Sequence, residues 1–330
     1  MGGDWNCNYP YGCGVLYKLD TAGTETVLHI FSGSPDGVGP AAPLVRDKAG
    51  NMYGTTGGGG SVGYGTVFKI DTAGKETVLY NFTGGSDGCN PYQGLVVGQF
   101  GALYGTAFGC GSSDAGTIFK VDRAGKFTLL HGFIGSDGRN PLYGHLTMDK
   151  SGNLYGLTEY GGAYGYGVLY KLTKRGTTVL HSFSYGTSDG CWTYGSVVQD
   201  KAGNFYGTTY RCGSYGYGTI WKVSQKDQET VLHNFDCTEA IGPVAGVVLD
   251  SKGNLYGVTS YGGADCGSDG YGVLYELSAS GTLTVLHTFG GSDGIYPDGE
   301  VLRTAKGTLY GTTSMGGGAN GAGTVWSYVP

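Results

Sequence analysis

The chain has 330 residues, of which 68 are glycine, and only 14% are charged, with a formal net charge of -6. Glycine averages about 7% in proteins, so this share is unusually high. No G-X-Y period accompanies it, which excludes a collagen-like helix, and the 13% of aromatic residues excludes a disordered chain. No basic stripe is present to neutralise phosphates, so nucleic acid is excluded as a partner. No apolar run approaches the roughly 20 residues that a membrane span requires.

A repeat of about 51 residues fills the chain. The tyrosine of a Y-G-[TLV]-[TA] phrase recurs with spacings of 51, 51, 51, 50 and 54 residues, at Tyr53, Tyr104, Tyr155, Tyr206, Tyr256 and Tyr310. A second phrase, G-[TV]-[VLI]-[FYW], begins at Gly14, Gly65, Gly116, Gly167, Gly218, Gly272 and Gly323. Such a period indicates one supersecondary unit that is used repeatedly. We therefore expect a single domain over residues 1–330, built from six repeats and one surplus strand.

Each repeat predicts four short strands, named A to D in chain order. In the unit that starts at Gly65, "GTVFKID" and "KETVLYNF" are rich in β-branched and aromatic residues and form strands A and B. A loop of glycine, aspartate and proline follows, which no helix could cross. The short apolar runs "GLVVGQ" and "ALYGTA" form strands C and D. No stretch shows helical periodicity beyond one turn.

Four-stranded sheets of this kind bury too little surface to be stable alone. Packed around an axis they cover one another, so we predict an all-β fold, a six-bladed β-propeller of four-stranded antiparallel blades; a seven-bladed propeller and a linear solenoid are the alternatives. The phrase "LVxDxxGNLYGTT" followed by "GxGTVFKID" resembles the inner strands of NHL-type and kelch-type blades. That resemblance implies the order C, D, A, B within a blade.

The strand count leaves one strand too many for six blades. The first strand A, at 14–20, and the last, at 323–328, compete for one place beside the sixth strands C and D. We expect the last strand A to take this place, with the first strand B, at 25–31, outside it. The first strand A would then be an exposed edge, held by the neighbouring Cys7–Cys13 pair, and a candidate for self-association.

The phrase set as a whole resembles the GloVer tandem-repeat family, named for Gloeobacter and Verrucomicrobia-type bacteria. The resemblance covers 14–328 and implies a secreted or surface-anchored bacterial protein. Many members carry a C-terminal sorting module, which this chain does not show, so we interpret it as an isolated repeat domain. The start Met-Gly-Gly-Asp lacks a basic and an apolar region, so any export signal is expected to be removed or to lie outside this sequence. The family offers no catalytic residues for transfer.

Eight cysteines follow the repeat frame in pairs. Cys89 and Cys110 are 21 residues apart, as are Cys191 and Cys212, and repeats that lack one member lack the other. In the fifth repeat both positions shift together, to Cys237 and Cys266; Cys7 and Cys13 remain as a pair. No C-x₂-C is present and no histidine accompanies a pair, which argues against a metal site. We predict four disulfides, and hence an oxidising compartment, extracellular or periplasmic.

Two sets of titratable residues recur with the repeat and are interpreted as structural. One strand B position carries histidine in five repeats: His29, His131, His181, His233 and His287. Asp-Gly pairs recur after strand B at Asp36, Asp87, Asp137, Asp189 and Asp293. We interpret the histidines as packing or hydrogen-bonding elements and the aspartates as turn caps. No cofactor is predicted, and calcium at these single carboxylates is the alternative, although a dense run of ligands is lacking.

Departures from the repeat are the candidates for function. The residue before strand C varies, and we expect that position to open onto the central channel. His145 and Glu300 occupy it three repeats apart, and they are expected on opposite sides of the ring. The residues predicted to form a ligand-binding rim there are His145, Glu300, Asp298, Tyr143, Tyr194 and Trp192. A histidine with a carboxylate could also perform acid–base catalysis.

Two functions follow from these observations. The first is a binding or scaffold module of the cell exterior, in which many of the 27 tyrosines stack on sugar rings of carbohydrate or extracellular-matrix ligands. The second is a secreted carbohydrate-active enzyme, a polysaccharide lyase or glycoside hydrolase with its site at the channel mouth. Near-identical repeats favour multivalent binding. Paired carboxylates on one loop would favour the enzyme, but the sequence shows none, and no catalytic residue is assigned.

We expect peptide mapping without reductant to recover the Cys237–Cys266 pair. Closing such a loop stabilises a protein by roughly 3 kcal/mol in the chain-entropy model, so reduction is expected to lower the melting temperature. A free thiol at either position, or a different pairing, would contradict the assignment.

Overall fold

A computed structural model describes residue 7 and residues 12–187, 189–263, 270–318 and 321–330 of the chain. The chain divides into two compact units. The first comprises residues 1–135, 139–154 and 172–177, and the second comprises residues 136–138, 155–171 and 178–330. Within the described ranges the regular elements are β-strands, apart from one turn of 3₁₀ helix at Gln99–Gly101.

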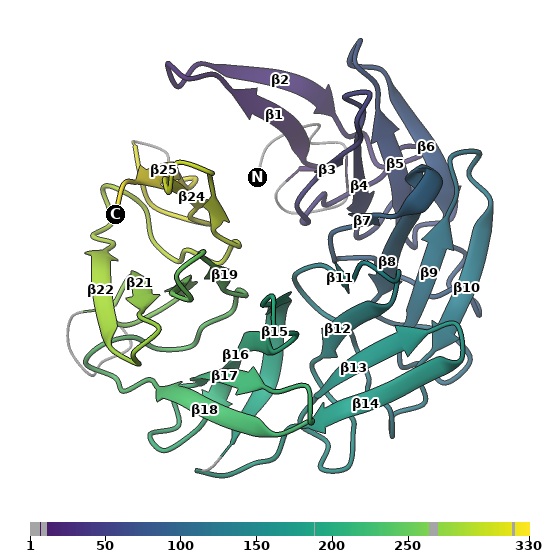
Figure 1. The fold of residues 1–330 in the computed structure, drawn as a ribbon. Helices are drawn as coiled ribbons and strands as arrows, with labels where there is room; N and C mark the ends of the chain where they lie inside the picture. Colours follow the sequence, from purple (N-terminus) through teal and green to yellow (C-terminus); the bar gives the residue numbers. More distant parts are fainter. Residues whose placement is uncertain (1–6, 8–11, 188, 264–269, 319–320) are drawn as a thin grey trace. The chain divides into compact units, whose positions relative to one another are not determined.

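Five sheets have four antiparallel strands each, in chain order (Figure 1). They are β3 (Val45–Arg46), β4 (Met52–Thr56), β5 (Thr66–Ile70), β6 (Glu76–Asn81); β7 (Val96–Val97), β8 (Leu103–Ala107), β9 (Thr117–Val121), β10 (Phe127–Gly132); β11 (Thr147–Met148), β12 (Leu154–Thr158), β13 (Val168–Thr173), β14 (Gly176–Ser182); β15 (Gly190–Gln199), β16 (Phe205–Cys212), β17 (Thr219–Val223), β18 (Glu229–Asn234); and β19 (Val248–Leu249), β20 (Leu255–Thr259), β21 (Val273–Leu277), β22 (Leu283–Thr288). The strand order confirms the predicted C, D, A, B blade.

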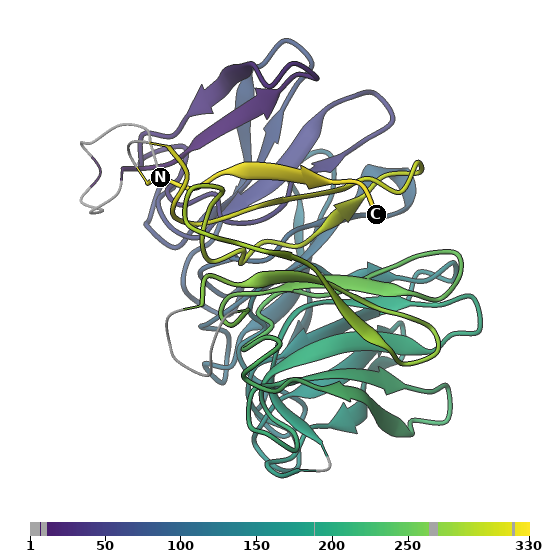
Figure 2. The same ribbon diagram turned by 90° about the vertical axis from the view of Figure 1, so that its left-hand side faces the viewer.

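Two smaller sheets contain the remaining strands. β23 (Leu302–Arg303), β24 (Leu309–Thr312) and β25 (Val325–Tyr328) form a three-stranded sheet, and β1 (Val15–Leu19) pairs with β2 (Glu25–Ile30). β24 and β25 run side by side in both views (Figures 1 and 2). The fold is thus an all-β six-bladed β-propeller with four-stranded antiparallel blades, as the repeat predicts.

The surplus strand behaves only partly as expected. The last strand A is β25, and it pairs with β24 as predicted. The expectation that the first strand B would lie outside it is wrong, because β2 pairs with β1 in a sheet of its own. The physical reason is local: β1 and β2 are joined by a short turn in which Asp20 accepts hydrogen bonds from the main-chain N–H groups of Ala22 and Thr24, at 2.9 and 2.8 Å. A hairpin with so short a connection forms more readily than a pairing with a distant strand.

The glycine of the Y-G phrase makes room for an aromatic ring. Gly54 on β4 lies opposite Phe68 on β5, and a Cβ placed on this glycine would come within 2.7 Å of the phenylalanine ring. The same relation holds between Gly207 and Trp221 in β16 and β17, at 2.5 Å. The ring of strand A therefore lies flat over a glycine of strand D, which explains why this glycine recurs with the period of the fold.

Within the first unit, phenylalanines join successive sheets. Phe31, which follows β2, lies 5.2 Å from Phe68 of the next sheet, between ring centroids. Phe82, which follows β6, lies 5.1 Å from Phe119 on β9. All four side chains are fully buried. Edge-to-face pairs of this kind contribute about 0.5–1.5 kcal/mol each beyond their burial.

The second unit uses the same interaction. Phe183, which follows β14, packs on Trp221 at 5.2 Å, and Phe235, which follows β18, packs on Tyr275 at 5.2 Å. The pair that involves the three-stranded sheet is Phe289 with Trp326, at 5.7 Å. The sheets of β3–β6, β15–β18 and β19–β22 therefore each contribute one ring to the core before them and one to the core after them.

The recurring histidines and Asp-Gly pairs bind one another. His29 Nε2 lies 3.0 Å from Asp36 Oδ2, and this carboxylate also accepts a hydrogen bond from the Ser32 N–H at 3.0 Å. Equivalent pairs join His181 to Asp189 at 3.3 Å and His287 to Asp293 at 2.6 Å. In the repeat where tyrosine replaces histidine, Tyr80 donates to Asp87 at 2.8 Å. In these four repeats both residues have the structural role expected of them, and in the fifth repeat His233 pairs with Glu239 at 2.9 Å.

Glu229, the first residue of β18, is an acidic residue whose ionised form is disfavoured by burial. Its Oε1 atom is buried without a hydrogen-bond partner. Burial raises the pKa of Glu229 to about 7, with a further increase from the charge of Asp189 and an opposing effect of His181. The folded state therefore favours the protonated form of this side chain.

This raised pKa predicts a specific loss of stability as pH increases. The favourable contribution of neutral Glu229 is complete below the ordinary pKa near 4.5 and is lost as pH rises through 7. We expect Glu229→Gln, which cannot ionise, to match the wild type at pH 4 and to exceed it in free energy of unfolding at pH 8, as measured by urea titration. Glu25→Gln, at the equivalent but exposed position of β2, is the control and should show no such divergence. Parallel stability curves for Glu229→Gln and the wild type would contradict this prediction.

Candidate functional site

One position in each repeat has a left-handed main chain. In five repeats it lies six or seven residues before the first strand of the sheet, and in the fourth repeat it lies within the longer strand β15. Its φ angles fall between 55° and 68°. Its occupants are Gly39, Asn90, Asn140, Trp192, Gly242 and Tyr296. Glycine and asparagine tolerate this conformation, whereas bulky aromatic residues rarely adopt it. Trp192 and Tyr296 therefore stand in a strained conformation that the fold itself does not require them to occupy.

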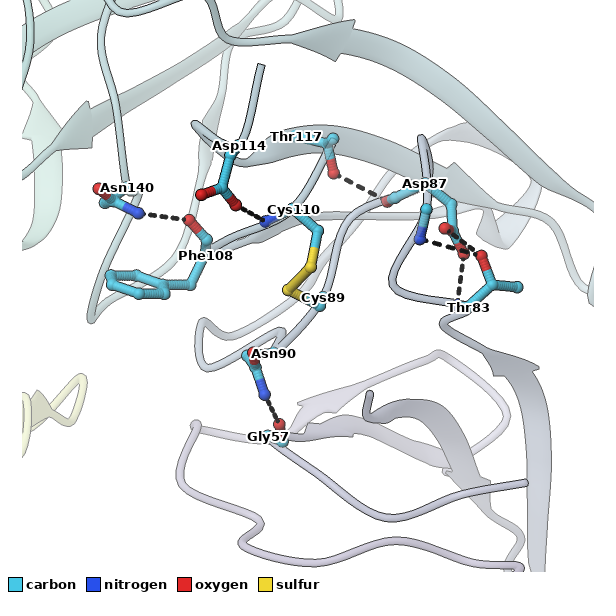
Figure 3. The surroundings of a disulfide bond; sticks show 11 residues. Gly57, Thr83, Asp87, Cys89, Asn90, Phe108, Cys110, Asp114, Thr117 and Asn140 are labelled. Carbon is cyan, nitrogen blue, oxygen red and sulfur yellow. Dashed lines mark hydrogen bonds between the residues drawn. A yellow bond between two sulfur atoms is a disulfide. The ribbon is translucent and has the colours of Figure 1, made fainter. Parts of the chain in front are cut away.

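In the first unit this position is structural. The Asn90 side chain donates from Nδ2 to the main-chain oxygen of Gly57 at 2.7 Å, and Asn140 donates likewise to Phe108 at 3.0 Å. Figure 3 shows both asparagines reaching neighbouring loops beside the Cys89–Cys110 disulfide. Asparagine at this position thus joins loops together and leaves no side chain free for a ligand.

In the second unit the sheet of β15–β18 differs from the others. β15 has ten residues, whereas the first strands of the other four-stranded sheets have two. The residue after Trp192 is Thr193, where the other repeats have proline. Proline lacks the N–H that a strand ladder needs, so threonine allows β15 to extend along β16, with Thr193 opposite Thr209. The extension carries Trp192 and Tyr194, and the Cys191–Cys212 disulfide closes its end.

A hollow of about 310 Å³ lies beside this disulfide. Trp192, Tyr185 and Arg211 are among its lining residues. The Tyr185 side chain is 72% exposed, and Tyr166 stands between the two aromatic walls, with its ring centroid 5.5 Å from Tyr185 and 6.4 Å from Trp192. The hollow therefore presents aromatic surface to solvent next to one cationic side chain.

A group of half-buried tyrosines adjoins this hollow; we call Tyr194, Tyr210, Tyr261 and Tyr296 the tyrosine row. The rings of Tyr194 and Tyr210 are 5.3 Å apart, and those of Tyr261 and Tyr296 are 5.2 Å apart. Burial raises the pKa of Tyr261, and the nearby Tyr210 and Asp298 raise it further. Gly242 lies between the two pairs: a Cβ on this glycine would come within 2.7 Å of the Tyr210 ring, and its carbonyl accepts a hydrogen bond at 3.3 Å from the N–H of Ser260, the residue before Tyr261.

Polar groups hold the row at both ends. The Tyr194 hydroxyl donates to Glu159 Oε1 at 2.8 Å, and Glu159 is buried. At the other end, Asp298 accepts hydrogen bonds from the hydroxyls of Ser260 at 2.5 Å and Ser314 at 3.0 Å. Desolvation by the surrounding protein atoms raises the pKa of Asp298, although the residue as a whole is exposed and the two serine hydrogen bonds oppose the shift.

The predicted rim residues fall into two groups. Trp192, Tyr194 and Asp298 lie in the second unit, on the hollow and the tyrosine row. Glu300 also lies there, and its Oε1 accepts a hydrogen bond from the Ser196 N–H at 2.9 Å. His145 belongs to the first unit, where it forms a parallel bridge with Gly94.

Tyr143 and the buried positions before strand C differ from the predicted open rim. Tyr143 has a left-handed main chain with φ of 56°, and its carbonyl accepts a hydrogen bond from Gln93 Nε2 at 3.1 Å. The expectation that the position before strand C opens onto a channel is wrong for Gly94, Ser196 and Gly246, which are buried. The main chains of neighbouring sheets approach too closely there; a Cβ on Gly246 would lie 2.4 Å from the Ser196 oxygen.

Sequence reasoning missed Tyr210, Arg211, Tyr261 and Tyr296. The signal was present, because the two positions after the Y-G-[TLV]-[TA] phrase also depart from the repeat. They hold Gly57 and Gly58 in the first repeat, but Tyr210 and Arg211 in the fourth. These departures lie at the same end of the sheets as Trp192, which only the strand pairing reveals.

Three of the four predicted disulfides lie in the described part of the chain. The structure contains the Cys7–Cys13, Cys89–Cys110 and Cys191–Cys212 disulfides. Cys266 lies outside the described residues, so its bond to Cys237 remains a prediction. Within the described ranges, no three histidine, cysteine or acidic side chains come together as a metal site. No helix in the described part of the chain is long and apolar enough to cross a membrane.

The sequence model of the Gloeobacter/Verrucomicrobia repeat matches residues 5–200 and 192–330. No curated protein matches the chain in sequence. Among solved structures, a candidate 6-phosphogluconolactonase from Bacteroides uniformis ATCC 8492 is 14% identical, with a TM-score of 0.59 over 97% of this chain and 92% of that chain. The extracellular domain of a candidate hybrid two-component system from B. thetaiotaomicron is 13% identical, with a TM-score of 0.55 over 87% of this chain and 31% of that chain.

A luciferin-regenerating enzyme is 15% identical, with a TM-score of 0.50 over 89% of this chain and 92% of that chain. At these identities the likeness shows the fold alone.

Because the main chain at Trp192 is strained, we predict that replacing this tryptophan does not lower the free energy of unfolding. Asparagine occupies the same conformation at Asn90 and Asn140, and a non-glycine residue in a sparsely populated region costs of order 1–3 kcal/mol. We expect Trp192→Asn to unfold at a urea concentration no lower than that of the wild type. Trp221→Asn, at a fully buried tryptophan, is the control and should be strongly destabilised. A large loss of stability in Trp192→Asn would show that this ring serves the fold.

Proposed function

The chain belongs to the Gloeobacter/Verrucomicrobia repeat family, and we propose that it is an extracytoplasmic binding module whose second unit takes carbohydrate on the tyrosine row and the adjoining hollow. The observation that carries this proposal is the left-handed main chain of Trp192 and Tyr296. Four repeats have glycine or asparagine there. Strain kept at two aromatic residues on one surface supports a role for those rings in binding.

The chemistry of the surface suits a sugar. A pyranose has an apolar face that packs on an aromatic ring and hydroxyl groups around its rim that form hydrogen bonds. The row supplies half-buried rings, and Glu159, Ser260 and Asp298 supply acceptors and donors beside them. The rings are held by neighbouring rings and hydrogen bonds, so little side-chain entropy is lost when a ligand binds.

The disulfides support a location outside the reducing cytoplasm. Bonds such as Cys89–Cys110 and Cys191–Cys212 persist in oxidising compartments. The extracellular origin of the similar B. thetaiotaomicron domain is in keeping with that location. We therefore propose that the protein acts at the cell surface or after secretion.

An enzyme acting on the same carbohydrate is the second candidate function. Asp298 supports it, because desolvation raises the pKa of this carboxyl group, and a raised pKa suits a general acid. The hydrogen bonds from Ser260 and Ser314 give a structural account of the same residue. We therefore rank binding first and catalysis second.

Binding of oligosaccharides, followed by isothermal titration calorimetry after a glycan-array screen, tests the proposal. Loss of one stacking ring costs about 1 kcal/mol, so we expect Tyr210→Ala to weaken the affinity about fivefold to tenfold. Phe100→Ala, at an exposed ring of the first unit, is the control and should bind as the wild type does. Binding that is equal in Tyr210→Ala and the wild type would overturn the assignment of the row. New reducing ends or unsaturated products that disappear with Asp298→Asn would favour the enzyme.

A further inference from the structure

We propose that the hollow beside Trp192 recognises an acidic sugar, with the guanidinium of Arg211 holding the carboxylate of a uronic acid. This inference rests on the proposed function and adds a ligand class to it. It is carried by the position of Arg211, by its lack of an acidic partner among the described residues, and by the aromatic walls around it.

Strand pairing fixes the position of Arg211. In the ladder of β15 and β16, Arg211 lies opposite Cys191, and the next residue, Cys212, is bonded to Cys191. The disulfide and the ladder therefore immobilise the main chain on both sides of this arginine. Its neighbour Cys212 also lines the hollow, together with Trp192.

The side chain of Arg211 is also held in place. Its guanidinium lies over the ring of Tyr210, 4.5 Å from the centroid, and its Nη2 donates to the Tyr210 hydroxyl at 3.2 Å. Stacking on an aromatic face leaves the edge of the guanidinium plane available for hydrogen bonds. Arginine has five N–H donors, and the structure assigns one of them to Tyr210.

No carboxylate of the described chain forms an ion pair with Arg211. Arg303 of the same unit provides a comparison, because it also lies over a tyrosine ring, that of Tyr256 at 5.7 Å. The charge of Arg303 lowers the pKa of Asp250, so this arginine has an acidic neighbour within the protein. Among the residues that the structure describes, Arg211 has no carboxylate in an ion pair with it, so its charge is available to an anionic ligand.

The residue is also a departure from the repeat. The equivalent positions in the other five repeats hold no cation; they are Gly58, Gly109, Tyr160, Tyr261 and Met315. The fold therefore has no general need for a positive charge at this point. Arg211 occurs in the repeat that also carries Trp192 in place of glycine or asparagine.

The shape of the hollow matches one sugar ring with a charged substituent. Its volume of about 310 Å³ is at the lower end of pockets that hold small ligands. The carboxylate of a uronic acid projects from the edge of the pyranose, so a ring stacked on Trp192 or Tyr185 can direct it sideways to a guanidinium. Guanidinium and carboxylate groups pair through two parallel hydrogen bonds, which adds geometric selectivity.

The net charge of the protein makes this site selective. A formal charge of -6 repels polyanions at long range, so an acidic glycan gains affinity only where a local cation contacts it. The contact would be weakened by salt, because the hollow is open to solvent. Neutral oligosaccharides would not show this salt dependence.

The experiment compares three probes by isothermal titration calorimetry on the full chain: an oligogalacturonate trisaccharide, a neutral galactose trisaccharide and a sulfated galactose trisaccharide. Hydrogen bonds to charged groups are worth roughly tenfold to a hundredfold in affinity. We expect the wild type to favour the oligogalacturonate by about that factor at low salt, and less at 0.5 M NaCl. Arg211→Gln should remove the preference for the oligogalacturonate over the neutral trisaccharide.

Two further variants complete the design. Arg211→Lys keeps the charge but not the planar fork, so we expect it to retain only part of the preference, and it also serves if Arg211→Gln fails to fold. Arg303→Gln is the matched control and should bind all three probes as the wild type does.

The outcomes separate this inference from the proposed function. Equal binding of acidic and neutral probes by the wild type, or a preference that survives in both Arg211 variants, would overturn the inference while the binding function stands. A preference for the sulfated probe alone would also overturn it, because the site would then select sulfate and not carboxylate. Absence of binding to every probe on the glycan array would remove the proposed function, and the inference with it.

Discussion

In both units, a phenylalanine at the end of the outer strand of one sheet packs against a strand A ring of the next, as Phe82 does on Phe119 and Phe235 on Tyr275. The rest of the structure depends on this contact, because a sheet of four short strands is too small to be stable alone. The contact needs a glycine under the strand A ring, as Gly54 lies under Phe68. The repeated phrases of the sequence are thus the two halves of one packing interaction.

The core residues and the hydrogen bonds from strand B to the loop after it, such as those of His29 with Asp36 and Tyr80 with Asp87, serve the fold. Variation is therefore permitted mainly at the ends of the sheets. The first unit uses this freedom for asparagine contacts between loops, such as Asn90 with Gly57. The second unit uses it for rings and charges, with Trp192 and Arg211 around one hollow. The same backbone position therefore joins loops in the first unit and carries the aromatic rings of Trp192 and Tyr296 in the second.

The extension of β15 shows how a small change creates that difference. Thr193 supplies an N–H where proline occurs in the other repeats, so the ladder with β16 lengthens and the Cys191–Cys212 bond closes it. The strained tryptophan and the stacked arginine both lie on this rigid ribbon. A rigid support of this kind reduces the entropy that a ligand must overcome on binding.

Strand type and the pairing of Cys89 with Cys110 and Cys191 with Cys212 follow from the sequence by itself, because each is repeated and therefore visible as a period. The packing role of the histidines and the Asp-Gly turns follows for the same reason. The strand order within a blade follows from the resemblance to NHL-type and kelch-type blades. Trp192, Tyr194 and Asp298 could be identified as departures from the repeat, but Tyr210, Arg211, Tyr261 and Tyr296 acquire meaning only when strand pairing places them beside those residues. The pairing of β2 with β1 follows from the short turn between them, in which Asp20 accepts two main-chain hydrogen bonds. The burial of Gly94, Ser196 and Gly246 was decided by the tertiary structure, because it depends on how closely the main chains of neighbouring sheets approach, which no residue pattern records.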